Sequence, residues 1–458
     1  MSDGPDLLVA GAGGGLVAAL RGAQLGLNVL VVERSTHFAR GNNTAMSTAM
    51  VPGAGTRWQA EAGIDDSPRI FVDDIMRKTK GQADIQLAAA LAGVSARLVT
   101  WMADDVGLPM SLVTDFGYPG HSRLRCHTVP GRSGREMLAG LLAAVRANPA
   151  IDLLTPCRLT AVHTEAATVS AVTVTYPDGR EETIPTRAVL LATNGFGADR
   201  DLVARYIPEI AGAMYHGSAE STGDALRIGM ALGADTAYLD AYQGHAALAH
   251  PAGTLAGWAT VMHGGVLVDA HGRRFGDETV GYSEYAHWVL AHAGGRAVIV
   301  LDRRVHEACL VFTDYRDTVE SGAVRWADTP EELAAAVGVD PDGLAATVAR
   351  VAELAGGTGV DEFGRTHWVA PLRPPYAGIG VVPALFHTQG GLRVDEHARV
   401  LRPDRTPISG LYASGGAAMG ISGHGAGGYL AGNGLLPALG LAFLAAEHVA
   451  AVHHGERD

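Results

Sequence analysis

The first 33 residues hold the pattern that most restricts how this chain can fold. Residues 6–10 are an apolar run typical of a buried strand, and the small residues Gly-Ala-Gly-Gly-Gly follow at 11–15. Residues 16–25 have the pattern of a helix, and a second apolar run at 28–32 ends at Glu33. This order of strand, glycine turn, helix, strand and acidic residue predicts a dinucleotide-binding unit, in which the carboxylate accepts hydrogen bonds from ribose hydroxyls.

The glycine spacing departs from the usual fingerprint of such units. Glycines let the backbone approach a pyrophosphate closely, and the helix N-terminus stabilises its charge. Counting from Gly11, the third glycine position falls on Leu16. Counting back from Gly15, the first two fall on Ala10 and Ala12. Two interpretations stay open, a turn one residue short or two glycines replaced by alanine. The competing structure is an ordinary glycine-rich turn.

Composition excludes several other functions. The formal net charge is −13 and the only lysines are Lys78 and Lys80, so no basic run offers a surface to nucleic acid. Cys126, Cys157 and Cys309 lie far apart and form no haem, iron–sulfur or redox-dithiol motif. The histidines lack the spacing of a metal site, so we expect no metal.

Two apolar stretches bear on localisation. Acidic residues precede the first one, where a signal peptide requires positive charge. The stretch at 434–446 is shorter than the roughly 20 residues that a membrane-spanning helix needs. We therefore expect a soluble, cytoplasmic protein without a membrane span.

Later motifs follow the opening unit in a fixed order. They are Ala-Thr-Asn-Gly-Phe at 192–196, Thr-Gly-Asp at 222–224, Gly-Gly-Val-Leu-Val and Arg-Phe-Gly-Asp-Glu within 264–278, Gly-Leu-Tyr-Ala-Ser-Gly at 410–415 and Ala-Gly-Asn-Gly-Leu at 431–435. This order resembles the fumarate reductase/succinate dehydrogenase flavoprotein superfamily, which includes soluble fumarate reductases, tricarballylate dehydrogenase and 3-ketosteroid Δ1-dehydrogenases. The resemblance covers nearly the whole chain and implies FAD as the cofactor.

The resemblance also implies an α/β fold with a Rossmann-like FAD-binding domain in two sequence segments and an inserted α+β capping domain. Composition agrees with this order, because aromatic and histidine-rich loops begin near residue 240 and glycine-rich sequence returns after about 386. We expect the first part of the FAD-binding domain at 1–239, the capping and substrate domain at 240–385 and the second part of the FAD-binding domain at 386–458.

The resemblance assigns residues of several motifs to the cofactor. They are Gly11, Gly13, Gly14 and Gly15 along the pyrophosphate, Glu33 at the adenosine ribose, Asn43, Thr44 and Ser47 in the loop under the flavin, Asp224 beside the cofactor, and Gly432, Asn433, Gly434 and Leu435 at the turn that opens the last helix. The positive end of that helix would face N1 and the C2 carbonyl of the flavin and stabilise the reduced ring.

Two positions depart from the family pattern around the cofactor. Gly416 stands where the family usually has a glutamate, which leaves one ribityl or ribose contact in doubt. Asn43 stands where membrane-bound members carry the histidine that attaches FAD, so we expect FAD to be non-covalent.

The largest departures concern the substrate. The fumarate reductases place a proton-donating arginine four residues beyond the position of Glu278, where this chain has Tyr282. The ketosteroid dehydrogenases have tyrosine there as the base. A second arginine, which binds the substrate carboxylate, is replaced by Tyr429, whereas two substrate-binding histidines are matched by His245 and His387.

These residues favour desaturation of a Cα–Cβ bond beside a carbonyl, with the hydride going to flavin N5 and the proton to Tyr282. Tyr429 would polarise the carbonyl. A tyrosine has an ordinary pKa of about 10, so it needs activation to act as a base near neutral pH. Either tyrosine could instead be a packing residue. The segment 118–123 could equally border the substrate pocket or form a surface loop.

Three other functions stay open. The chain could be an ene-reductase of an unsaturated acid or ketone, like the fumarate reductases. It could be a flavin oxidase acting on a C–N bond, with Arg365 or Arg393 holding a carboxylate. It could also bind FAD without catalysis. Reoxidation requires an external acceptor, which could be O2, a quinone or a partner protein, because no second nucleotide-binding unit is present.

Overall fold

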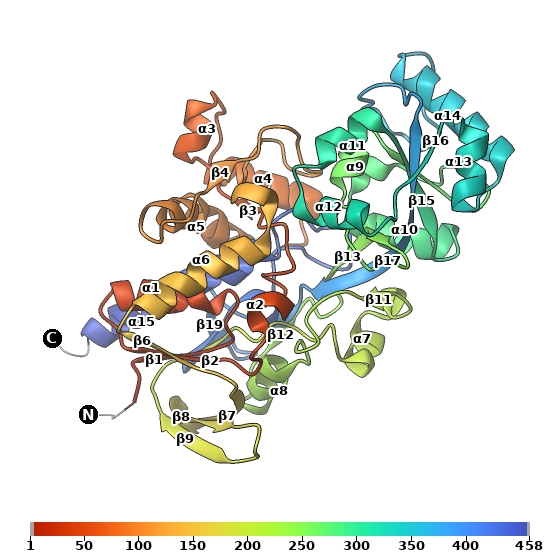
Figure 1. Cartoon of the computed structure of the whole chain (residues 1–458). Helices are drawn as coiled ribbons and strands as arrows, with labels where there is room; N and C mark the ends of the chain where they lie inside the picture. Colours follow the sequence, from red (N-terminus) through yellow and green to blue (C-terminus); the bar gives the residue numbers. More distant parts are fainter. Residues whose placement is uncertain (1–3, 456–458) are drawn as a thin grey trace.

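The computed structural model describes residues 4–455, which form two lobes (Figure 1). The larger lobe is built on a nine-stranded sheet. Its strand β1 (Leu7–Ala10) runs parallel to β2 (Val29–Val32) on one side and to β10 (Val189–Leu191) on the other. Strand β20 (Pro407–Ala413) pairs with β10, so a segment near the end of the chain joins the sheet that residues near its beginning start.

The strands at the centre of this sheet are buried on both faces. All four residues of β1 and all three of β10 are buried, as expected for a parallel sheet covered by helices. The order along the sheet is β6-β2-β1-β10-β20-β8-β7, with β9 beside β8 and β19 beside β20. The remaining strands are β6 (Ile151–Leu154), β7 (Arg158–Glu165), β8 (Thr168–Thr175), β9 (Glu181–Pro185) and β19 (Arg399–Leu401).

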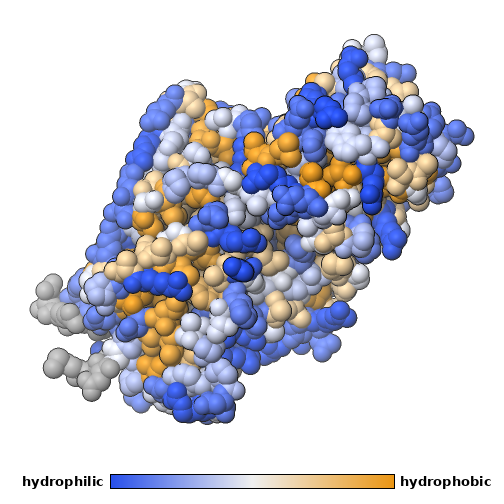
Figure 2. All heavy atoms as spheres, viewed as in Figure 1, coloured by the Kyte–Doolittle hydropathy of each residue, from blue (hydrophilic) through white to orange (hydrophobic). Residues whose placement is uncertain are grey.

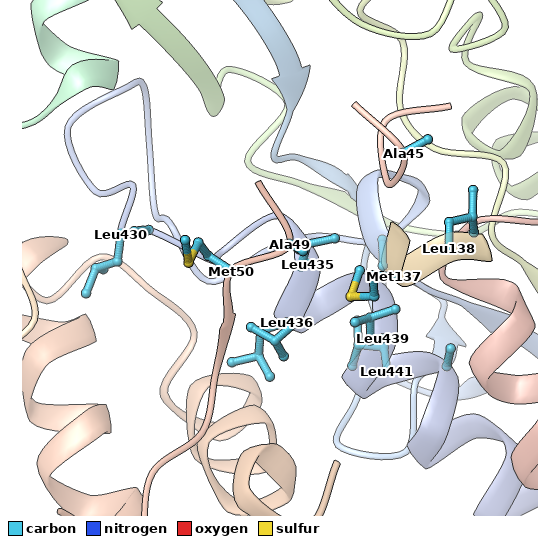
Figure 3. Packing of buried hydrophobic residues seen from close by; sticks show 14 of the residues in the cluster. Ala45, Ala49, Met50, Met137, Leu138, Leu430, Leu435, Leu436, Leu439 and Leu441 are labelled. Atoms are coloured by element: carbon cyan, nitrogen blue, oxygen red, sulfur yellow. The ribbon is translucent and has the colours of Figure 1, made fainter. Parts of the chain in front are cut away.

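The helix that follows the glycine turn packs against the last helix of the chain. Helix α1 (Gly15–Gln24) contacts α15 (Leu435–Gly455), which also contacts α5 (Ile85–Asp104). Figure 3 shows side chains of α15 and α6 (Gly134–Ala147) in one buried cluster. The other helices of this lobe are α2 (Phe38–Gly41), α3 (Arg57–Glu61), α4 (Pro68–Lys78), α7 (Arg200–Tyr206) and α8 (Asp224–Ala231).

The last helix is longer than its apolar stretch suggests. It continues for 21 residues, because the polar side chains in its second half have partners within the fold. Glu447 binds Arg21 (2.6 Å), and His448 binds Tyr412 (2.9 Å). The length argument against a membrane span is therefore wrong. Within residues 4–455, α15 and α5 are long and apolar enough to cross a bilayer, but 67% and 56% of their apolar windows are buried in the protein. Core helices share these features, so the absence of a span stays a prediction.

The smaller lobe is built on the long strand β17 (Tyr376–Thr388). It pairs with β13 (Tyr242–Ala249), β15 (Ala297–Asp302) and β11 (Met214–Tyr215). The other elements of this lobe are β14 (Val266–Val268), β16 (Arg325–Ala327), α9 (Ala259–Met262), α10 (Tyr282–His292), α11 (Arg303–Cys309), α12 (Thr313–Glu320), α13 (Pro330–Val337) and α14 (Pro341–Ala355).

This second sheet crosses the domain boundaries expected from the sequence. Strand β11 precedes residue 240, and the last residues of β17 follow residue 385. The division into 1–239, 240–385 and 386–458 therefore stays a prediction. The described chain also has two small sheets, which contain β12 (Thr236–Ala237) with β18 (Gly391–Leu392), and β3 (Val51–Pro52) with β5 (Cys126–Thr128) and β4 (Ser111–Leu112).

The start of α1 lies so close to β1 that it tolerates no side chain. A Cβ atom at Gly15 would lie 2.6 Å from Cγ1 of Val9, so we expect Gly15→Ala to lower the free energy of unfolding by about 1–3 kcal/mol. Gly93 is exposed within α5, and no atom lies within 4 Å of the place that its Cβ atom would take. Gly93→Ala should therefore raise the free energy of unfolding by about 0.5–1 kcal/mol. Urea unfolding measures both changes. Equal midpoints for the two variants would contradict the close packing of α1 on β1.

Candidate active site

One large cavity runs between the two lobes. Residues of both lobes line it. Its wall extends from the glycine turn and Glu33 at one end, past Asn43, to Tyr282 and Tyr429 at the other. On the face shown in Figure 2, apolar residues gather at the surface where the lobes meet, beside α12. The cavity therefore has room for a long cofactor and a substrate in one continuous space.

The glycine turn forms one wall of this cavity. Gly11, Gly13 and Gly14 line it, and Gly14 is the N-cap of α1. Backbone N–H groups at a helix start have no intrahelical acceptor and can bind an anion. Gly15 is not part of the wall, because it packs against Val9 of β1. Close helix–strand packing is the role of the third glycine in dinucleotide-binding units. The spacing counted back from Gly15 is thus the one that fits, with Ala12 at the middle position.

Glu33 is buried at the end of β2 and lines the cavity. Its carboxylate accepts hydrogen bonds from the backbone N–H groups of Ala12 (2.8 Å) and Ser35 (2.8 Å). Burial raises the pKa of this carboxyl. The two N–H donors hold its oxygens beside the glycine turn, which is where a ribose hydroxyl of a dinucleotide would need an acceptor.

Asp224 lines the same end of the cavity from the first turn of α8. Both of its carboxylate oxygens bind Arg158 (2.7 and 3.0 Å), and one lies 3.2 Å from Arg34. These two arginines are the only Lys or Arg side chains in the cavity wall as the structure describes it. Positive charge is therefore confined to the end occupied by Glu33 and Asp224.

The loop after α2 connects the two ends of the cavity. Asn43 accepts a hydrogen bond from the N–H of Ser218 (2.7 Å) and donates one to the carbonyl of Phe386 (3.3 Å). Ser47 donates to the carbonyl of Thr44 (2.7 Å), which shapes the turn. All three predicted loop residues, Asn43, Thr44 and Ser47, line the cavity.

Two buried hydroxyls in the cavity wall fit a polar cofactor. Oγ1 of Thr193 and Oγ of Ser414 have no hydrogen-bond partner among residues 4–455. Buried polar atoms are normally paired, so each is available to a bound group. Sequence reasoning used the motifs that contain them but did not assign either residue to the site. Their position at the carboxyl ends of β10 and β20 was the available signal, since ligands of parallel sheets bind there.

The turn before α15 forms the opposite wall. Gly432, Gly434 and Leu435 line the cavity. Asn433 does not. Its fully buried side chain donates a hydrogen bond to Oγ of Ser422 (3.2 Å) and so holds the turn from behind. A Cβ atom at Gly434 would lie 2.6 Å from Nε2 of His387, so glycine is needed for the turn to meet that ring.

Four of the predicted substrate residues come together at the far end of the cavity. Tyr282, at the start of α10, stacks on His245 with ring centroids 4.7 Å apart. Tyr429 lies edge-on to Tyr282, with ring centroids 5.7 Å apart. His387 lies edge-on to Tyr429 at 6.2 Å.

Burial keeps the two histidines neutral. It lowers the pKa of His245 to about 3 and that of His387 to about 4. Nδ1 of His245 accepts a hydrogen bond from the N–H of Ala247 (3.1 Å), so its proton is on Nε2. Nδ1 of His387 lies 3.1 Å from the carbonyl of Thr388 and donates to it. Nε2 of His245 has no partner among the described residues, whereas Nε2 of His387 lies 3.2 Å from the amide nitrogen of Gln389 and accepts its hydrogen bond.

A third tyrosine belongs to the same cluster. Tyr118 lines the cavity, so this residue of the segment 118–123 borders the pocket and is not part of a surface loop. Burial raises the pKa of Tyr118 and of Tyr282 well above the ordinary value, and it also raises that of Tyr429. At neutral pH all three hydroxyls keep their protons.

The two arginines that could have held a carboxylate are used elsewhere. Arg365 binds the buried Glu278 (3.1 Å), and Arg393 binds Asp235 (2.6 Å). Neither lines the cavity. In the part of the chain that the structure describes, no three His, Cys, Asp or Glu side chains are grouped for a metal ion. Among the described residues, no lysine or arginine thus lines the cavity beside its tyrosines.

A family model described as an FAD binding domain matches residues 6–435. The chain belongs to this family of the fumarate reductase/succinate dehydrogenase flavoprotein superfamily. Its cofactor is FAD, and it is an FAD-dependent oxidoreductase. The cavity fits FAD, with glycine N–H groups, Glu33 and two free hydroxyls along its wall.

Curated relatives carry the names of both expected activities. A probable fumarate reductase of Shewanella frigidimarina is 28% identical over 92% of this chain and 71% of its own length. A 3-oxosteroid 1-dehydrogenase of Mycobacterium tuberculosis is 29% identical over 69% of this chain and 63% of its own. The NADH:fumarate oxidoreductase of Klebsiella pneumoniae is 28% identical over 91% of this chain, which spans only 45% of that protein.

Solved structures agree on the fold. The open conformation of a flavocytochrome c3 fumarate reductase superposes with a TM-score of 0.80 and 26% identity over 97% of this chain and 78% of that one. A 3-ketosteroid Δ4-(5α)-dehydrogenase of Rhodococcus jostii superposes with a TM-score of 0.76 and 24% identity over 98% of both chains. The second likeness concerns the fold alone.

The non-covalent attachment of FAD stays a prediction. Asn43 has an amide that cannot form the covalent link, and its hydrogen bonds hold it between Ser218 and Phe386. We expect acid precipitation of the purified yellow protein to leave all FAD in the supernatant, measured by its absorbance. Flavin that stays with the precipitated chain would contradict this.

Proposed function

We propose that the protein desaturates a Cα–Cβ bond next to a carbonyl in a neutral ketone or related compound. Bound FAD supplies the hydride acceptor for the β-carbon. The chain supplies the groups that bind the carbonyl and remove the α-proton. The proposal rests on the cluster of Tyr118, Tyr282 and Tyr429 in the wall of a cavity that also holds the cofactor-binding turns.

Tyr282 is the proposed base. In its deprotonated form it takes the α-proton on its phenolate oxygen and becomes neutral tyrosine, while the electron pair of the C–H bond forms the new C=C bond and the β-hydrogen leaves as hydride. Stacking on His245 and the edge-on contact with Tyr429 fix the ring of Tyr282. A base held in this way needs no reorganisation before proton transfer.

Tyr429 is the proposed donor to the substrate carbonyl. Its ring lies edge-on to the rings of Tyr282 and His387, and its side chain lines the cavity, so its hydroxyl can donate to a bound ligand. A donor aimed at the carbonyl oxygen stabilises the enolate-like charge that develops when the α-proton leaves. His245 and His387 are neutral and can add further hydrogen bonds without adding charge.

The lack of a lysine or arginine in the described cavity wall beside the tyrosines carries this proposal. Dicarboxylates are held by arginines because the guanidinium matches a carboxylate fork. Here Arg34 and Arg158 are engaged with Asp224 at the other end, and Arg365 and Arg393 lie outside the cavity. A ketone needs one donor on its oxygen, and the tyrosines provide it. The same absence of cations disfavours an amino acid as the substrate of a C–N oxidase.

Reduction of an enone is the second candidate, and one observation favours it. Burial raises the pKa of Tyr282 well above its ordinary value, so at neutral pH the hydroxyl is protonated and ready to donate. Removal of a proton from the substrate requires the deprotonated form. We also propose an external electron acceptor or donor, which could be O2, a quinone or a partner protein, and a cytoplasmic location.

Replacement of Tyr282 tests its role. Tyr282→Phe should keep the FAD content and lower turnover by about 10²–10⁴-fold, because a positioned proton-transfer group is lost. The wild-type dehydrogenation rate should rise with pH as the hydroxyl deprotonates, and this rise should be absent in the variant. The matched control is Tyr285→Phe on the same helix, whose buried hydroxyl has no partner among the described residues and lies outside the cavity wall. Wild-type turnover in Tyr282→Phe would make this residue a packing group.

Substrate charge gives an independent test. We expect the FAD-loaded wild type to reduce or oxidise cyclic ketones and to show little or no fumarate reduction or succinate oxidation. Replacing a charged hydrogen bond by a neutral one lowers its contribution from about 1.5–3 to about 0.5–1.5 kcal/mol per contact. Stopped-flow measurement of the flavin absorbance with ketones, acids and amines separates the candidates. Efficient fumarate reduction with an artificial electron donor would contradict the proposal.

A further inference from the structure

The cavity contains a carboxyl group that the proposed reaction does not use. Asp314, in the first turn of α12, lines the same cavity as Tyr282. Its Oδ2 atom is buried and has no hydrogen-bond partner among residues 4–455. Burial and the nearby Asp317 raise the pKa of Asp314 to about 7. A buried polar atom without a partner is unfavourable, and a ligand in the cavity can relieve it.

One row of contacts connects Asp314 with the tyrosines through the smaller lobe. Thr318, one turn further along α12, donates a hydrogen bond to Oγ1 of Thr254 (2.9 Å). The loop that follows Thr254 lines the cavity and reaches Trp258, whose ring lies 6.4 Å from that of Tyr282. This wall is apolar between the two ends, with Leu255 in its middle.

A second row runs on the side of the larger lobe. Phe312, next to α12, has its ring 6.0 Å from that of Phe116, which lies 4.7 Å from the ring of Tyr118. Tyr118 shares the cavity wall with Tyr429. Tyr118 and Phe312 thus line the cavity between the proposed carbonyl site and Asp314, and Phe116 contacts both rings from outside the cavity wall. A ligand whose carbonyl binds Tyr429 would lay an apolar body along these walls and bring its far end toward the carboxyl.

We propose that Asp314 determines substrate specificity by accepting a hydrogen bond from a hydroxyl group at the end of the substrate remote from its carbonyl. This inference rests on the proposed function, which fixes the carbonyl at the tyrosines. An oxo group at that end has no proton to donate, and an anion would meet the negative charge of Asp314 and Asp317. Burial raises the pKa of Asp314 to about 7, and the protonated carboxyl could donate to an oxo group, so the preference for a hydroxyl group is expected and measured at pH 8.5, where the carboxylate can only accept.

Two steroid ketones with one skeleton test the inference. FAD-loaded Tyr282→Phe protein, which should bind without turnover, is titrated with 17β-hydroxyandrost-4-en-3-one and with androst-4-ene-3,17-dione, and binding is followed by the flavin absorbance. We expect the hydroxyl compound to bind roughly fivefold to tenfold more tightly, the effect of one buried hydrogen bond. Asp314→Leu should abolish this preference. Asp317→Asn, at an exposed position of the same helix, is the matched control and should keep it.

Three results would overturn the inference: equal affinities for the two compounds, a preference that survives in Asp314→Leu, or no binding of either compound. Turnover is measured separately with the wild type and either ketone. If the preference is present and no dehydrogenation or reduction occurs, the inference stands and the proposed reaction fails. If turnover occurs without the preference, the reaction stands and the role of Asp314 fails.

Discussion

The close contact between the glycine turn and the last helix holds the two walls of the site together. A Cβ atom at Gly14 would lie 2.6 Å from the carbonyl oxygen of Ala438 in α15, so the contact requires glycine. Strands β1 and β20 belong to one sheet through β10, which brings residues from both ends of the chain to this place. The turn at 11–15 and the turn at 432–435 therefore open into one cavity. Each would otherwise be an isolated helix start with half of a cofactor site.

Burial decides the chemistry at the other end of that cavity. Removal of water lowers the pKa of His245 to about 3 and raises that of Tyr282 well above its ordinary value, so both groups are neutral. The positive charge in the wall belongs to Arg34 and Arg158, which bind Asp224. This separation places polar, charged groups where a dinucleotide needs them and neutral hydrogen-bonding groups where a carbonyl substrate would bind.

Some residues of the motifs have structural roles that a linear pattern does not distinguish from ligand contacts. Gly15 must be a glycine because Val9 leaves no room for a side chain. Asn433 stabilises its turn by a hydrogen bond to Ser422. The sequence did not show how far α15 extends, because Glu447 interrupts the apolar pattern and its partners Arg21 and Arg97 lie far away in the chain. Thr193 and Ser414 became recognisable only through their burial without partners in the described chain.

The sequence by itself determined the opening βαβ unit, the FAD-binding motifs and the replacement of two family arginines by Tyr282 and Tyr429, because these depend on local spacing and residue type. The tertiary structure alone decided which side chains share a cavity. It placed Tyr118 with the other tyrosines, left Asp314 without a partner among residues 4–455, and engaged Arg365 and Arg393 elsewhere. Burial and pairing arise from contacts between residues far apart in the chain, and no local pattern encodes them.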